Sequence, residues 1–176
     1  MLSTIPGTVI WSPFDEATLK MCLSKALYET DGIAAVRYPR GLCPNDNTEE
    51  YSDIYMSYGG EEKSDILIVT YGRISGYART IDGVDIMTML KIFPISSEAV
   101  SLALRYKKVF FFEEGMRNGG IAEKFMCLLY ENGYSGKYRI FAAASSPAAA
   151  ETEQQLADAG LDREGMIRAI KDETET

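Results

Sequence analysis

The stretch VFFFEEGMRNGGIAEKF, residues 109–125, contains an apolar run, then a polar turn with two glycines, then the start of a helical pattern. Four consecutive apolar residues bounded by polar ones are typical of a strand buried on both faces, as in a parallel sheet. The same order, an apolar strand followed by a helix, recurs along most of the chain. It therefore predicts an α/β fold with a mainly parallel sheet.

The remaining strands and helices follow from the same patterns. Predicted strands cover 8–11, 33–36, 54–58, 66–69, 84–87, 108–112 and 138–141, and predicted helices cover 15–29, 74–80, 97–104, 119–130, 150–157 and 163–171. Such interleaving favours a doubly wound, three-layer α/β/α arrangement.

The domain organisation is expected to have three parts. Residues 1–41 form a βαβ unit too small to cover its own core, so they are interpreted as the tail of a larger domain. Residues 42–64 are polar and turn-forming, and are interpreted as a linker with an edge strand. Residues 65–176 form the main domain.

Composition narrows the possible functions. The 176 residues carry a net charge of −8, which disfavours binding to nucleic acid, and they include no histidine, which excludes Ser-His-Asp and Cys-His catalysis. Three cysteines without a CxxC pair support neither a zinc site nor a disulfide framework. No apolar run reaches the roughly 20 residues needed to cross a bilayer. We expect a cytoplasmic protein with no metal site, membrane contact or nucleic-acid partner.

The first candidate site is the segment RYPRG, residues 37–41, directly after a predicted strand. Ligands of open parallel sheets bind beyond the carboxyl ends of the strands. Arg37 and Arg40 could offer forked donors to a phosphate there. The alternative, a pair of surface arginines bonded to nearby carboxylates, also fits the residues.

The second candidate is EEGMRNGG, residues 113–120. Glu113 and Glu114 could perform acid/base chemistry, but successive side chains of an extended segment point opposite ways. Gly119 and Gly120 would let a helix start pack closely. We favour a structural or interface role for all four residues. The segment YGRISG, residues 71–76, is interpreted as a tight turn between strand and helix, since it lacks the glycines of a dinucleotide site.

These segments, in this order, resemble the C-terminal part of 1-deoxy-D-xylulose-5-phosphate synthases. The run IPGTVIWSPFDEATLKMCLSKALYETDGIAAVRYPRG is similar to the end of the family's pyrimidine-binding domain. DILIVTYG, MLKIFPIS, VFFFEEGMRNGGIAEKF and LADAGLDREGMIRAI resemble successive parts of its transketolase-type C-terminal domain. The resemblance covers almost the whole chain.

The resemblance implies an activity for the full-length enzyme. Such transferases condense pyruvate with glyceraldehyde 3-phosphate, with loss of CO2, using thiamine diphosphate and Mg2+, on the route to isoprenoid precursors, thiamine and pyridoxal. It implies that Arg40, and more weakly Arg37, helps to hold the substrate phosphate. It also implies a homodimer in which this part contacts the remaining domains.

The family's GDG-type magnesium motif, activating glutamate and catalytic histidines have no counterpart in this sequence. We therefore expect no catalytic residue and no bound cofactor in this chain, which alone would be inactive. A cloned fragment, a natural truncation and a split subunit all fit. The alternatives are the corresponding domain of a transketolase or of a 2-oxo-acid dehydrogenase beta subunit, and a non-catalytic regulatory module with the same fold.

Overall fold

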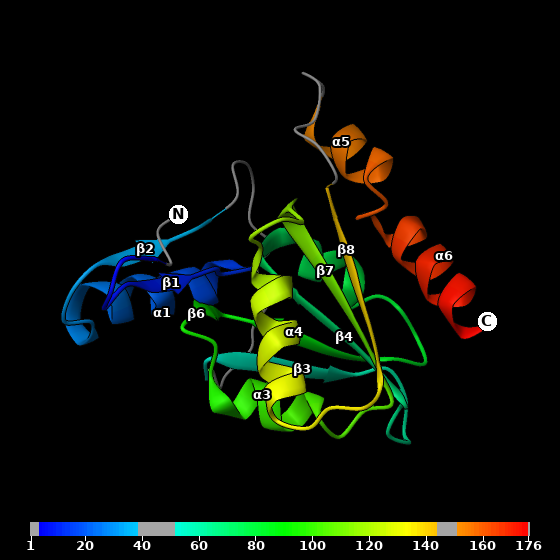
Figure 1. The fold of residues 1–176 in the computed structure, drawn as a ribbon. Helices are drawn as coiled ribbons and strands as arrows, with labels where there is room; N and C mark the ends of the chain where they lie inside the picture. Colours follow the sequence, from blue (N-terminus) through cyan, green and yellow to red (C-terminus); the bar gives the residue numbers. More distant parts are fainter. Residues whose placement is uncertain (1–3, 39–51, 144–150, 176) are drawn as a thin grey trace.

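The computed structural model describes residues 4–38, 52–143 and 151–175 and contains two sheets (Figure 1). The larger sheet has the strand order β3-β5-β4-β7-β8, in which only β3 is antiparallel to its neighbour. Its strands are β3 (Ile54–Tyr58), β4 (Ile66–Tyr71), β5 (Asp85–Met89), β7 (Lys108–Met116) and β8 (Lys137–Ala143). The predicted α/β fold with a mainly parallel sheet is confirmed.

Helices cover both faces of the larger sheet. They are α2 (Ser75–Ala78, after a 3-10 turn at Gly72–Ile74), α3 (Ser97–Ala103), α4 (Ile121–Glu131), α5 (Thr152–Asp158) and α6 (Arg163–Thr174). Helices α3 and α4 share one apolar core with the sheet, and α2, α5 and α6 share the other. This arrangement gives three layers.

The run VFFF explains why both faces must be covered. Val109 and Phe111 belong to the core shared with α3 and α4, whereas Phe110 and Phe112 belong to the opposite core. All four side chains are fully buried. Alternate residues of a strand point to opposite faces of the sheet. A continuous apolar run therefore requires that helices cover both faces of the sheet at β7.

The smaller sheet has the order β2-β1-β6. Strands β1 (Val9–Trp11) and β2 (Ala34–Val36) are parallel and are connected by helix α1 (Glu16–Ser24) and a π-helical turn at Lys25–Glu29. Asp15 caps α1, since its carboxylate accepts a hydrogen bond from the Thr18 amide at 2.7 Å. This is the βαβ unit that the sequence predicted.

Strand β6 (Lys91–Phe93) joins the two sheets. It follows β5 after a single residue but pairs antiparallel with β1. The amide of Ser12 also donates to the carbonyl oxygen of Leu90 at 2.7 Å. The sequence patterns did not predict this strand. Its position holds the βαβ unit beside the carboxyl end of the larger sheet.

Two predicted helices differ from the observed ones. The helix expected at 74–80 is only the short α2, preceded by a 3-10 turn. The helix expected at 15–29 is α1 followed by the π-helical turn, and Leu23 and Leu27 on this segment are 40% and 70% exposed. Within the described residues, we find no helix with the length and apolar character needed to cross a bilayer.

Candidate functional site: a two-arginine hollow at the switch point of the sheet

Strand order alone selects one place on the larger sheet. The chain continues from β4 to β5 on one side, while β7 lies on the other side of β4. In a doubly wound sheet, this reversal opens a crevice beyond the carboxyl ends of the two central strands, and ligands bind in it. Tyr71, Gly72 and Arg73 end β4 and begin the next turn, and Glu114 belongs to the last part of β7.

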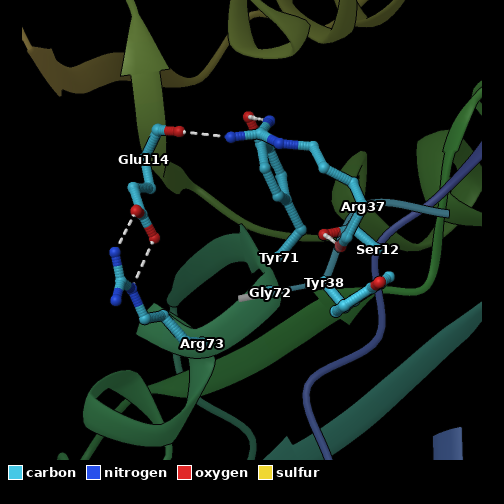
Figure 2. A pocket seen from close by; sticks show the side chains of 7 residues that line it. All are labelled: Ser12, Arg37, Tyr38, Tyr71, Gly72, Arg73 and Glu114. Carbon is cyan, nitrogen blue, oxygen red and sulfur yellow. Dashed lines mark hydrogen bonds and ion pairs between the residues drawn. The ribbon is translucent and has the colours of Figure 1, made fainter. Parts of the chain in front are cut away.

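The small βαβ unit closes this crevice into a hollow of about 90 Å³ (Figure 2). Ser12 follows β1, and Arg37 and Tyr38 follow β2, so these residues also stand at carboxyl ends of parallel strands. The Ser12 hydroxyl donates to the carbonyl oxygen of Arg37 at 3.4 Å. The hollow is therefore built from both sheets.

Arg37 extends across the hollow and contacts both central strands. Its Nη1 donates to the Tyr71 hydroxyl at 3.3 Å, and its Nη2 donates to the backbone oxygen of Glu114 at 2.8 Å. The guanidinium carbon lies 5.4 Å from the centre of the Tyr71 ring. Both acceptor oxygens are uncharged, so these contacts leave the positive charge of Arg37 available to an anion.

Tyr71 forms the buried wall of the hollow. Only 3% of the residue is exposed. Burial, and secondarily the carboxylate of Glu113, raise the pKa of Tyr71 to about 12. The side chain is therefore a neutral phenol at physiological pH and adds no negative charge that would repel an anion.

Arg73 and Glu114 form an ion pair at the side of the hollow. The Nε of Arg73 donates to Oε2 of Glu114 at 2.9 Å, and its Nη2 donates to Oε1 of the same carboxylate. The two side chains are 28% and 35% exposed. The pair is thus accessible to solvent and has the two-point geometry that arginine also uses with phosphate.

Glu113 is not among the residues that line the hollow, and its carboxylate contacts helix α4. It is 1% exposed, and its Oε2 accepts a hydrogen bond from the Ala122 amide at 2.8 Å. Burial raises the pKa of Glu113, while the amides of Ala122 and Ile121 oppose that rise. Glu113 and Glu114 therefore do not converge, as expected for neighbours on a strand, and they do not form a paired-carboxylate site.

The two glycines have different surroundings. A side chain at Gly120 would place its Cβ 1.8 Å from Oε1 of Glu113, so the carboxylate occupies the space that glycine leaves. Gly119 has a φ of +74° and open space around it, and its amide donates to Glu123 at 2.7 Å. Gly120 therefore allows the strand and helix to approach each other closely, whereas Gly119 allows the positive φ of the turn before α4.

Of the sequence-predicted phosphate ligands, the structure places Arg37 in the hollow, and Arg40 lies outside the described residues. Sequence patterns did not select Tyr71, Arg73 or Ser12 as site residues. The strand order would have identified the first two, because it decides which strand ends face one another. Within the described ranges there is no group of three or more cysteine, aspartate and glutamate residues placed to hold a metal ion.

Comparisons with known proteins agree with the resemblance drawn from the sequence. No protein-family model matches the chain. A 1-deoxy-D-xylulose-5-phosphate synthase of Chromohalobacter salexigens is 30% identical over 99% of this chain, and one of Dechloromonas aromatica is 28% identical over 98%. The chain spans only 28% and 29% of those relatives' lengths.

A solved structure described as a split gene transketolase, an inactive beta4 tetramer, has the same fold. Its TM-score is 0.80 at 18% identity, with 97% of this chain and 59% of that chain covered. The similarity to 1-deoxy-D-xylulose-5-phosphate synthases and the transketolase C-terminal type of fold are therefore confirmed.

Proposed function

We propose that this chain is the C-terminal part of a 1-deoxy-D-xylulose-5-phosphate synthase and that it contributes substrate-phosphate binding and domain packing. The supporting observation is the hollow at the switch point, where Arg37 holds an available positive charge beside neutral oxygen atoms. In a protein of net charge −8, an anion site has to be local. This site fits the phosphate of glyceraldehyde 3-phosphate.

The hollow binds and orients, and it offers no group for the carbon chemistry. Thiamine diphosphate with Mg2+ would supply that chemistry in the complete enzyme, which condenses pyruvate with the aldehyde and releases CO2. The family's GDG-type magnesium motif and its activating glutamate have no counterpart in this sequence. We therefore assign the cofactors to the remaining domains and expect this chain alone to be inactive.

The remaining synthase domains are the proposed partner, within a cytoplasmic homodimer. Leu23, Leu27 and Tyr28 are 40%, 70% and 83% exposed on α1 and the following π-helical turn. A neighbouring domain would cover these apolar side chains. Residues 1–41, 42–64 and 65–176 keep their proposed assignments as domain tail, linker and main domain.

A second candidate is the C-terminal domain or a separate subunit of a transketolase. It is favoured by the structural likeness to a protein whose description names a split gene. The two candidates differ in their substrates. Pyruvate consumption together with the missing domains would indicate the synthase, whereas transfer between sugar phosphates would indicate the transketolase.

The test is isothermal titration of the chain with thiamine diphosphate and Mg2+, and then with glyceraldehyde 3-phosphate. We expect no heat from the cofactor, and weak binding of the aldehyde that Arg37→Ala removes. Arg163→Ala is the matched control, because Arg163 bonds to Thr80 outside the hollow. Tight cofactor binding, or aldehyde binding unaffected by Arg37→Ala, would overturn the proposal.

A further inference from the structure

Two arginines of the hollow converge on one residue (Figure 2). Arg37 binds the backbone oxygen of Glu114, and Arg73 binds its carboxylate at two points. Glu114 thus occupies the whole fork of Arg73, while the contacts of Arg37 leave its charge available.

We propose that Arg73 is a second phosphate-binding residue and that the Glu114 carboxylate occupies its donor fork until a phosphate displaces it. The inference rests on the proposed function, because it concerns the same hollow. A guanidinium fork binds carboxylate and phosphate with the same parallel pair of hydrogen bonds. Arg73 would exchange two bonds to carboxylate oxygens for two bonds to phosphate oxygens, with no covalent change.

The exposure of the pair makes the exchange feasible. Both side chains are about one-third exposed, so the released Glu114 carboxylate can be hydrated at once. Ion pairs with this much solvent contact contribute little to stability. A phosphate dianion would be attracted by the positive charges of both Arg37 and Arg73. Of these two arginines, the singly charged Glu114 carboxylate bonds only Arg73.

The arrangement also predicts selectivity. A monoatomic anion such as chloride cannot accept two parallel bonds from one guanidinium, so it competes poorly with the resident carboxylate. Glu114 would then keep the site closed to chloride and open to phosphate monoesters.

The experiment is an NMR titration of the 15N-labelled chain with inorganic phosphate, following the amides of Gly72 and Gly115, which flank the pair. Glu114→Gln removes the competing charge and should tighten phosphate binding by about fivefold, the scale of a partly exposed ion pair. Glu131→Gln removes the same charge from an exposed position on α4 and should bind phosphate like the wild type. Arg73→Lys in the Glu114→Gln background keeps the charge but loses the fork, and should abolish most of the gain.

The outcomes separate this inference from the proposed function. If Arg37→Ala weakens phosphate binding while Arg73→Lys and Glu114→Gln leave it unchanged, the phosphate site stands and the role of Arg73 is overturned. If only the Arg73 and Glu114 variants respond, the inference stands and the role of Arg37 falls. Absence of binding in both the wild type and Glu114→Gln would overturn both. Thermal unfolding of each variant establishes that it is folded.

Discussion

At the residue scale, one buried carboxylate holds the junction of β7 and α4. Glu113 faces the start of α4, where amide groups without helical partners are available to it. Burial acts against the charged form, and the amides and the more distant Arg37 act in its favour. Burial is the larger effect, so the pKa of Glu113 lies above its ordinary value.

This raised pKa makes stability depend on pH in a defined direction. A carboxyl group whose folded pKa exceeds its unfolded value of about 4.3 binds its proton more tightly in the folded state. Its contribution is fully present below the unfolded pKa and is lost as pH rises through the folded pKa. We therefore expect the free energy of unfolding of the wild type, minus that of Glu113→Gln, to decrease as pH rises from about 4.

Urea denaturation at a series of pH values measures this difference, with Glu131→Gln as the exposed control. A difference that increases with pH would mean that the helix amides outweigh burial and hold the pKa of Glu113 low. In that case, the assignment of burial as the dominant cause would be wrong.

Gly120 provides the second prediction at this scale. In Gly120→Ala the new Cβ would lie 1.8 Å from Oε1 of Glu113 and 2.9 Å from the Met116 carbonyl oxygen, so strand or carboxylate has to move. Overpacking of this kind costs about 1–3 kcal/mol. Gly76→Ala is the matched control, because its Cβ meets nothing within 4 Å in helix α2. It should stabilise the chain slightly or leave it unchanged, and equal effects of the two substitutions in urea denaturation would contradict the argument.

At the scale of elements, the sequence predicts best what depends on local periodicity. The run of residues 109–112 identifies β7, and an apolar pattern with polar ends identifies α4 and α6. Strand β6 was missed because its three residues are defined by pairing with the distant β1. The helix at α2 was predicted too long because the chain turns after Ala78, where the amides of Thr80 and Ile81 donate to carbonyl oxygens three residues back.

In the candidate site, too, local sequence patterns predict some features, and long-range pairing of strands determines the others. Arg37 was predicted from its place after a strand, which is a local property. Its contact with Glu114 joins residues 77 apart in the sequence and depends on strand order and on β6 holding the two sheets together. No local pattern contains that information, which is why Arg73 was not recognised as a neighbour of Arg37.

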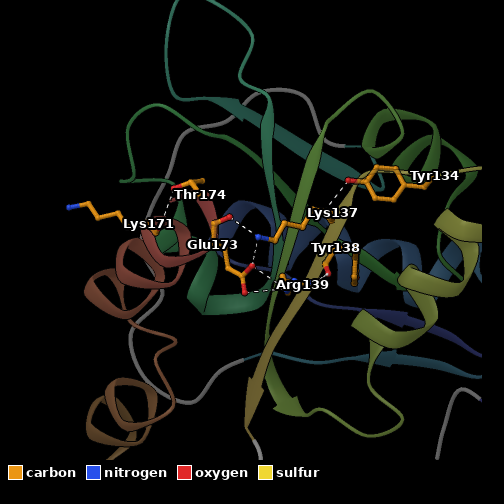
Figure 3. Close-up of polar contacts among 7 residues, drawn as sticks. All are labelled: Tyr134, Lys137, Tyr138, Arg139, Lys171, Glu173 and Thr174. Carbon is orange, nitrogen blue, oxygen red and sulfur yellow. Dashed lines mark hydrogen bonds and ion pairs between the residues drawn. The ribbon is translucent and has the colours of Figure 1, made fainter. Parts of the chain in front are cut away.

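The polar contacts between helix α6 and the edge strand β8 are centred on Glu173 (Figure 3). Lys137 donates to the carboxylate at 2.7 Å and to the backbone oxygen of Glu173 at 2.8 Å, and Arg139 donates to the carboxylate at 3.1 Å. The hydrogen bond from Lys137 lowers the pKa of Glu173. This contribution to stability is present above the unfolded pKa and is lost as pH falls through the lowered folded value.

Glu173→Gln should therefore lower the free energy of unfolding at neutral pH by at most about 1 kcal/mol, because the groups remain partly hydrated. The loss should shrink in high salt, which screens the pair. Glu175→Gln, an exposed change at the end of the same helix, is the control. Urea denaturation of both variants at two salt concentrations measures the loss. A loss that is equal in Glu173→Gln and Glu175→Gln, or that does not change with salt, would contradict the stabilising role of the Glu173 ion pairs.

At the scale of the whole molecule, the two units differ in how well they cover their apolar residues. The larger sheet has a buried apolar core on each face. The βαβ unit of the smaller sheet instead leaves four large apolar side chains at the surface: Leu23, Leu27, Tyr28 and Ile33. In Figure 1 this unit projects to one side of the larger sheet. A group of exposed large apolar side chains on one segment marks an interaction surface.

The last prediction concerns that surface. Replacing Leu27 and Tyr28 together by serine should change the stability of the isolated chain by no more than about 0.5 kcal/mol, because neither side chain is buried. Binding to the proposed partner should weaken by at least about tenfold, since buried apolar anchors carry much of an interface's energy.

Analytical ultracentrifugation with the Chromohalobacter salexigens synthase, truncated before the region that matches this chain, measures the association. Tyr130→Ser, which removes a 49% exposed ring from α4, is the control for a general loss of apolar surface. If the wild-type chain does not bind, or if the double variant binds as tightly as the control, then these residues do not face the cofactor-binding domains and the partner assignment falls.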